Sequence, residues 1–193
     1  GDKDVMWAEF IDEETLAFSS RGGRVALWKY PEMTPICYFE TVSGAVPALS
    51  PDRKYIAFSN GEQLGLFDVA QHEIALQRST PSKLQWPYLA FSPSGKRIGC
   101  VAFDKVLCWD IETGELLQEI PANGSNFHGQ IDFPHDNFLL AGGKTLIDID
   151  NQLKLWHYDG AEQLHTVGGW TFMAATDGSK PGALIAAQLP HPA

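Results

Sequence analysis

The chain of 193 residues is long enough for one sizeable core or for an array of small repeated units. Its content of 44% hydrophobic and 20% charged residues is ordinary for a soluble globular protein and excludes wholesale disorder. The formal net charge of −10 argues against nucleic-acid partners and against an anionic membrane surface, because proteins that bind such polyanions collect Lys and Arg.

Targeting and membrane-spanning segments are not indicated by the sequence. No apolar run approaches the ~20 residues that a helix needs to cross a bilayer. The opening residues, GDKDVMWAEF, have neither the basic segment nor the apolar core of a signal peptide. We therefore expect a soluble protein and leave its compartment open.

Four segments share one pattern, in which an alternating apolar strand, a polar turn and a second apolar strand follow one another. These segments begin at Val25, Leu64, Val106 and Thr145. A bulky side chain stands in the middle of each first strand: Trp28, Phe67, Trp109 and Ile147. These positions are 39, 42 and 38 residues apart, so the pattern repeats with a period close to 40.

A second pattern repeats in step with the first and precedes it. A turn containing Pro51, Pro93 or Pro134 leads into a strand, and these prolines are 42 and 41 residues apart. A further strand is expected just before each turn, at residues 6–10, 46–49, 88–91 and 130–133. Each repeat therefore contains four short strands and no helix.

Four-stranded units with a period of about 40–45 residues are typical of β-propeller blades. The segment SPSGKRIGCVAFDKVLCWDIETGELL resembles a blade of the WD-repeat family, with Trp109 and Asp110 as the pair that names the family. The resemblance extends from about Trp7 to Tyr158. The Gly-His pair that the family places between blades is absent, and His128-Gly129 is its nearest, reversed counterpart.

The fourth repeat has two possible registers. In one, residues 150–157 form the third strand. In the other, residues 146–150 form the third strand and residues 153–158 the fourth, with Asn151 and Gln152 in the turn. The second register restores the period and resembles the repeats of quinoprotein-type propellers, so it is the one that we expect.

The predicted fold is all-β, a β-propeller-like array of about four and a half four-stranded antiparallel blades in a single partial propeller. The expected blades span residues 5–43, 44–82, 83–125 and 126–165, followed by an incomplete blade over residues 166–193. Two strands of the incomplete blade are expected near residues 168–178 and 182–189, after a Gly-rich link. An open array exposes blade faces, so we expect either a fragment of a larger protein, pairing of two copies through the open edges, or completion of the last blade by the N-terminus.

Catalytic, cofactor and metal sites are not indicated. His128, Asp132, His135 and Asp136 straddle a strand and its turn, which scatters their side chains. Asp148 and Asp150 are expected to point the same way from one strand, but no nucleophile accompanies them.

The three cysteines, Cys37, Cys100 and Cys108, are expected to be buried free thiols. A Cys100–Cys108 bridge across a hairpin is the alternative, and it depends on the strand register.

Aromatic side chains are expected in two environments. Those on strands are assigned to the core: Trp28, Phe58, Phe67, Phe91 and Trp109. Those in the loops that join successive blades are candidates for a partner-binding rim: Trp86, Tyr88, Phe127, His128 and Trp170. The alternative for this second group is that its members cover the blade edges.

The function that these observations favour is a non-enzymatic interaction or scaffold module that presents propeller loops to a protein or peptide partner. Two alternatives are a quinoprotein-like ligand-binding or enzymatic propeller and a purely structural, self-assembling repeat. Fold resemblance by itself does not choose among them.

Overall fold

The computed structural model describes residues 4–121, 129–157, 161–167, 170–175 and 183–188. By its internal contacts the chain divides into two compact units, Gly1–Ala90 and Phe91–Ala193. Each unit is described by itself. None of the described residues belongs to an apolar helix of the length that a bilayer crossing requires.

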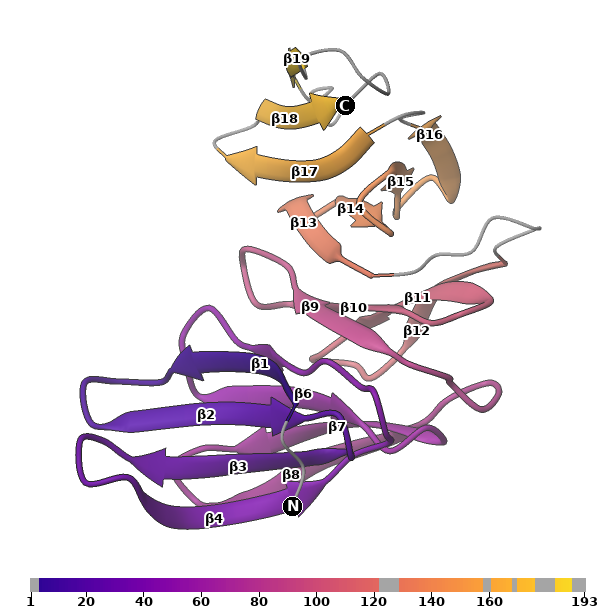
Figure 1. Ribbon diagram of the computed structural model, residues 1–193. Coiled ribbons are helices and arrows are strands. Elements are labelled where there is room, and N and C mark those ends of the chain that lie inside the picture. Colours follow the sequence, from indigo (N-terminus) through magenta and orange to yellow (C-terminus); the bar gives the residue numbers. More distant parts are fainter. Residues whose placement is uncertain (1–3, 122–128, 158–160, 168–169, 176–182, 189–193) are drawn as a thin grey trace. The chain divides into compact units, whose positions relative to one another are not determined.

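The described strands form antiparallel sheets whose members follow one another in the chain (Figure 1). Blade 1 contains β1 (Val5–Phe10), β2 (Thr15–Ser20), β3 (Arg24–Lys29) and β4 (Thr34–Glu40). Blade 2 contains β5 (Ala48–Leu49), β6 (Tyr55–Ser59), β7 (Gln63–Asp68) and β8 (Glu73–Ser79). Blade 3 contains β9 (Tyr88–Phe91), β10 (Arg97–Val101), β11 (Lys105–Asp110) and β12 (Leu116–Pro121). Blade 4 contains β13 (Ile131–His135), β14 (Phe138–Ala141), β15 (Thr145–Asp148) and β16 (Leu153–His157). The predicted fold class, an all-β array of four-stranded antiparallel blades, is confirmed.

The fourth repeat adopts the register that the period favours. Strand β15 ends at Asp148, and β16 pairs with it through Asp148↔Leu153 and Leu146↔Trp156. Asp148 accepts hydrogen bonds from the backbone N–H and the side-chain amide of Asn151, at 3.0 and 2.9 Å. The turn therefore lies at Asn151 and Gln152, and the alternative in which residues 150–157 form the third strand is wrong.

The last sheet has one strand more than the sequence predicts. It contains β17 (Ala161–Val167), β18 (Trp170–Ala175) and β19 (Ala183–Gln188), in the order β17-β18-β19. Residues 161–167 were expected to belong to a link and to the end of blade 4. The segment AEQLHTV alternates poorly between apolar and polar residues, so the pattern by which the other strands are recognised is missing.

The turn between the third and fourth strands has one residue with positive φ at the same position in each of the four described blades. An aspartate ends the third strand in blades 2 to 4, and its carboxylate accepts backbone N–H groups of the turn, as when Asp110 accepts Thr113 N at 2.8 Å. Four residues after the strand end, the backbone has positive φ: Met33 (53°), His72 (55°), Gly114 (70°) and Gln152 (56°). Glycine adopts this conformation without strain, so Gly114 in ETGE is explained by the turn. Asp110 is likewise a turn residue, and the hydrogen bond from the Thr113 backbone, the main cause, lowers its pKa.

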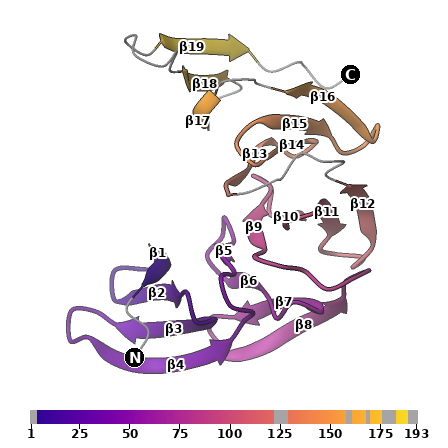
Figure 2. The same ribbon diagram turned by 45° about the vertical axis from the view of Figure 1, so that its right-hand side comes forward.

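The core of the first unit lies between blades 1 and 2, whose sheets pack face to face (Figure 2). Phe39 of β4 contacts two rings of blade 2, with centroids 5.0 Å from Phe58 and 4.4 Å from Phe67. Phe58 in turn covers Gly65 of the neighbouring strand, where an added Cβ would come within 2.4 Å of its ring. The contact is thus filled to ordinary core density, and a side chain larger than Gly65 would displace Phe58.

Arginines make polar contacts between successive blades within each unit. Arg53, in the turn before β6, donates to the carbonyl oxygens of Phe10 and Ile11 in blade 1, both at 3.2 Å. Arg97 of β10 donates to the Asp136 carbonyl at 3.0 Å and pairs with the Asp150 carboxylate at 2.7 Å in blade 4. Neighbouring blades within each unit are thus joined by polar contacts near their turns and by apolar packing between the middles of their sheets.

We expect Phe39→Ala to lower the free energy of unfolding by about 3–5 kcal/mol, because it removes the ring that contacts both Phe58 and Phe67. Tyr38→Ala, one residue earlier, is the matched control. Tyr38 is 65% exposed, so its loss should cost about 1 kcal/mol or less. Urea denaturation followed by circular dichroism measures both values, and equal losses in the two variants would contradict the prediction.

Candidate functional site

The structure brings two of the five predicted rim residues together. Trp86 lies in the loop between β8 and β9, where half of its side chain is exposed, and Tyr88 opens β9 two residues later. Trp170 belongs to the second unit and opens strand β18 rather than lying in a loop as expected. Phe127 and His128 lie outside the described residues.

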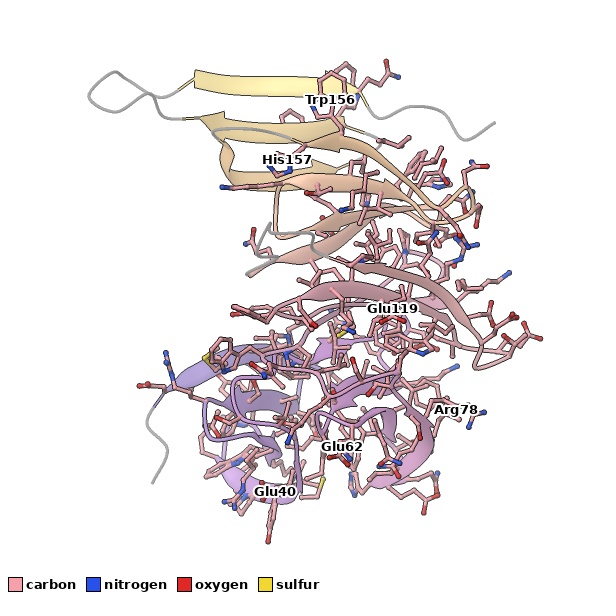
Figure 3. The ribbon with its side chains drawn as sticks, turned by 90° about the vertical axis from the view of Figure 1, so that its right-hand side faces the viewer. Glu40, Glu62, Arg78, Glu119, Trp156 and His157 are labelled. Carbon is pink, nitrogen blue, oxygen red and sulfur yellow. The ribbon has the colours of Figure 1, made fainter. Side chains whose placement is uncertain are left out.

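The loop that carries Trp86 is held against neighbouring loops by backbone hydrogen bonds. Val46 forms a parallel bridge with Tyr88, in which Val46 N donates to Pro87 O at 2.8 Å and Leu89 N donates to Val46 O at 3.0 Å. On the other side, Leu84 N donates to Gly61 O at 2.6 Å. Thr80 donates twice to the carbonyl of Glu62, which is labelled in Figure 3. The loop therefore has a defined position although it lies at the surface.

Trp86 has a fixed place because of Gly44. A Cβ added to Gly44 would lie 2.6 Å from Cδ1 of Trp86, so the indole ring occupies the space that any other residue would fill. Both residues have positive φ, 74° for Gly44 and 48° for Trp86. A left-handed backbone is rare for a residue as bulky as tryptophan and is found where the surrounding structure imposes it. The backbone and the neighbouring glycine thus hold the ring in one position.

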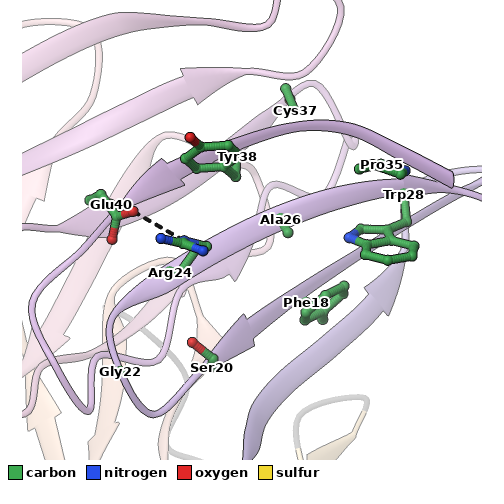
Figure 4. A pocket seen from close by; sticks show the side chains of 10 residues that line it. All are labelled: Phe18, Ser20, Gly22, Arg24, Ala26, Trp28, Pro35, Cys37, Tyr38 and Glu40. Atoms are coloured by element: carbon green, nitrogen blue, oxygen red, sulfur yellow. Dashed lines mark hydrogen bonds and ion pairs between the residues drawn. The ribbon is translucent and has the colours of Figure 1, made fainter. Parts of the chain in front are cut away.

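A second surface of the first unit was not predicted from the sequence. It is a hollow of about 350 Å³ on the face of blade 1 opposite to blade 2 (Figure 4). Phe18 and Trp28 form its aromatic part, with ring centroids 6.0 Å apart. The Arg24 guanidinium lies 4.8 Å from the centroid of the Tyr38 ring, and its Nε donates to Glu40 at 3.1 Å.

Trp28 corrects one of the core assignments. Phe58, Phe67 and Trp109 are buried as expected, at 2%, 3% and 3% exposure. Trp28 occupies the same repeat position as Phe67 and Trp109, but it is only half-buried and lines the hollow. Phe91 is also only half-buried. The repeat predicts on which face of its sheet a residue lies. Whether that residue is buried depends on whether another sheet packs against this face, and the repeat does not predict this.

In the second unit, Trp156 of β16 is an exposed aromatic that the sequence analysis did not select. Its side chain is 63% exposed, and the adjacent His157 has Nδ1 2.9 Å from the Thr145 hydroxyl (Figure 3). Trp156 had been taken as an ordinary strand residue. The apolar residues of LKLWH predict a strand, but they do not show whether its apolar side chains are covered. The exposure of Trp156 therefore could not be predicted from the sequence.

Residues considered for chemistry do not form a reaction site within the described part of the chain. Asp136 accepts Ser94 N at 2.9 Å; burial opposes its ionisation, but hydrogen bonds from Ser94 and Ser92 lower its pKa overall. His135 accepts the backbone N–H of Asn137. Asp148 binds the Asn151 turn and Asp150 binds Arg97, so the two carboxylates do not act as a pair. No group of three potential metal-ligating side chains occurs among the described residues.

The cysteines are free thiols with different exposure. The strand register places Cys100 opposite Leu107 and Cys108 opposite Gly99, so the two side chains lie on opposite faces and the Cys100–Cys108 bridge is wrong. Burial raises the pKa of both thiols, that of Cys108 to about 12. Cys37 is partly exposed, and burial raises its pKa as well.

Comparison with known proteins shows the fold and leaves the family open. No protein-family model matches the chain. The transcriptional corepressor LEUNIG_HOMOLOG of Arabidopsis thaliana is 19% identical over 139 residues, which cover 72% of this chain and 17% of that protein. The hydrazine synthase of Kuenenia stuttgartiensis has a similar structure, with a TM-score of 0.62, 14% identity, and coverage of 93% of this chain and 61% of that one. The chain thus spans less than two thirds of either protein.

We expect one thiol of the folded chain, Cys37, to react with a chromogenic disulfide reagent at mildly alkaline pH. Cys100 and Cys108 should react only after unfolding, because burial blocks access and disfavours their thiolates. Counting the released chromophore with and without guanidinium chloride tests this. Rapid reaction of all three thiols in the native protein would contradict the burial of β10 and β11.

Proposed function

We propose that this chain is a non-enzymatic protein-interaction module that presents the Trp86 loop and its neighbours to a protein or peptide partner. The observation that carries the proposal is a half-exposed tryptophan held in a strained backbone conformation against Gly44. Tryptophan is enriched among the residues that dominate binding energy at interfaces. A ring that is already positioned loses little conformational entropy on binding, which favours affinity.

The surroundings of Trp86 support a peptide or protein rather than a small molecule. The ring lies at the meeting point of three loops, 41–47, 60–62 and 80–87, whose backbones are tied together by hydrogen bonds. Loops held by a rigid sheet scaffold are the usual place for recognition. Lys83 and Glu62 are exposed in the same loops, which leaves polar groups of both signs around the aromatic anchor.

The similarity to a transcriptional corepressor is consistent with a binding role, whereas the similarity to hydrazine synthase extends to the fold alone. Among the described residues, no group of three potential metal-ligating side chains occurs. The formal charge of −10 disfavours a polyanionic partner. We therefore expect a neutral or basic peptide segment with an apolar side chain that packs on Trp86. Tyr88 is proposed to support the same contact, and Trp170 to contribute a separate one from the second unit.

The proposal predicts that Trp86→Ala weakens a selected peptide ligand by about thirtyfold, equivalent to about 2 kcal/mol. The ligand is obtained by selecting a displayed random-peptide library on the full chain, and its affinity is measured by fluorescence anisotropy. Trp156→Ala, which removes a comparably exposed tryptophan outside the three loops, is the matched control and should leave the affinity unchanged.

Gly44→Ala tests whether the position of the ring matters. The added Cβ would clash with Cδ1 of Trp86, so peptide affinity should fall although the tryptophan remains. Gly143→Ala is the control, because it also introduces a side chain at positive φ, but it lies outside the three loops and its Cβ meets its nearest neighbour at an ordinary 3.8 Å. Selection of peptides that bind all four variants equally would show that the Trp86 loop is not the binding site.

A further inference from the structure

The outer face of blade 1 carries residues that occupy the same repeat positions as a buried face of blade 2. Phe18 and Trp28 of blade 1 correspond to Phe58 and Phe67 of blade 2. The strand pairs agree, since Leu16 is opposite Trp28 and Ile56 is opposite Phe67. In blade 2 this face is covered by blade 1 through Phe39, and Phe58 and Phe67 are only 2% and 3% exposed.

Among the described residues of the first unit, no other sheet covers the corresponding face of blade 1. Phe18 and Trp28 are half-buried and line the 350 Å³ hollow. Tyr38, on the same face, is 65% exposed. Further exposed apolar side chains lie along the strands and turns of this blade: Val5 (62%), Phe10 (47%), Tyr30 (43%), Met33 (48%) and Ile36 (38%). An apolar surface of this kind on a sheet is typical of an interaction surface.

The residues on this face are complementary to one another across the β3–β4 pair. The register places Arg24 opposite Glu40, Ala26 opposite Tyr38, and Trp28 opposite Pro35. Each cross-strand pair therefore joins a positive to a negative side chain or a large to a smaller one. A two-fold axis that runs parallel to the strands, between β3 and β4 and above the face, exchanges the two members of every pair. It would place Arg24 over Glu40 of a second copy and Tyr38 over its Ala26.

We propose that two copies of this chain associate through the open face of blade 1 around this two-fold axis. The contact is isologous, because the same patch serves both copies. Trp28 of each copy lies under β4 of the other, with Pro35 over its ring, while Phe18 on β2 lies at the edge of the contact. The Arg24–Glu40 ion pair, whose side chains are 57% and 61% exposed in the single chain, becomes two interchain pairs at the rim.

Charge reversal at the two rim residues tests whether this face forms the contact between copies. Arg24→Glu places two acidic residues on the face, and Glu40→Arg places two basic ones. In either variant alone, each interchain pair would join like charges, so we expect self-association to weaken by at least tenfold. When the two variants are mixed, every interchain pair again joins opposite charges, and a heterodimer should form with nearly the affinity of the wild-type homodimer.

Sedimentation velocity of the full chain over a range of micromolar concentrations measures these equilibria, with a fluorescent label on one variant to follow the mixture. Tyr38→Ser, at an exposed position, provides a second variant that should weaken the dimer without affecting folding, and thermal unfolding checks each protein. A wild-type chain that stays monomeric, or a mixture that associates no better than its components, would overturn the proposal. Binding at this face by another protein's sheet would appear as the first of these outcomes.

Discussion

The organising constraint in this protein is that each four-stranded sheet has apolar side chains on both of its faces, so it gains stability wherever other atoms cover them. The contact of Phe39 with Phe58 and Phe67 meets this requirement between blades 1 and 2. In the second unit, Gly99 of β10 lies directly against blade 4, since an added Cβ would come within 2.5 Å of Leu139. The stacking of repeated sheets and the core between them follow from this requirement, and the outer face of blade 1 is where the first unit leaves it unmet.

Much of the fold could be predicted from the sequence because its main signals are local. Alternation of apolar residues, turn chemistry at Pro51 and Pro93, and the spacing of Trp28, Phe67 and Trp109 together located the strands of four blades. Strand β17 was not predicted, because its segment AEQLHTV lacks regular alternation of apolar and polar residues. Its backbone pairs with β18, and such pairing cannot be read from the side chains. The prediction that Trp28 is buried was also wrong. A repeat position specifies the face of the sheet on which a side chain lies, but not whether another sheet covers that face.

The candidate site was predicted only in part, for a related reason. Trp86 and Tyr88 could be selected from the sequence, because both are aromatic and both lie in a loop that joins successive blades. The role of Gly44 could not be predicted, because it depends on two loops 42 residues apart meeting through the Val46–Tyr88 bridge. The hollow on blade 1 depends likewise on the pairing of Arg24 with Glu40 across β3 and β4, which only the strand register reveals.

The turns that end the third strands explain why the blades are hard to recognise by residue identity. The same left-handed position occurs four residues after Lys29, Asp68, Asp110 and Asp148, yet it is filled by Met33, His72, Gly114 and Gln152. Only blade 3 combines the aspartate with a glycine and so matches the usual residue pattern of such a turn. A positive φ thus recurs at this position in four blades, although a different residue adopts it each time. Structural similarity to a solved protein likewise extends over 93% of the chain at only 14% sequence identity.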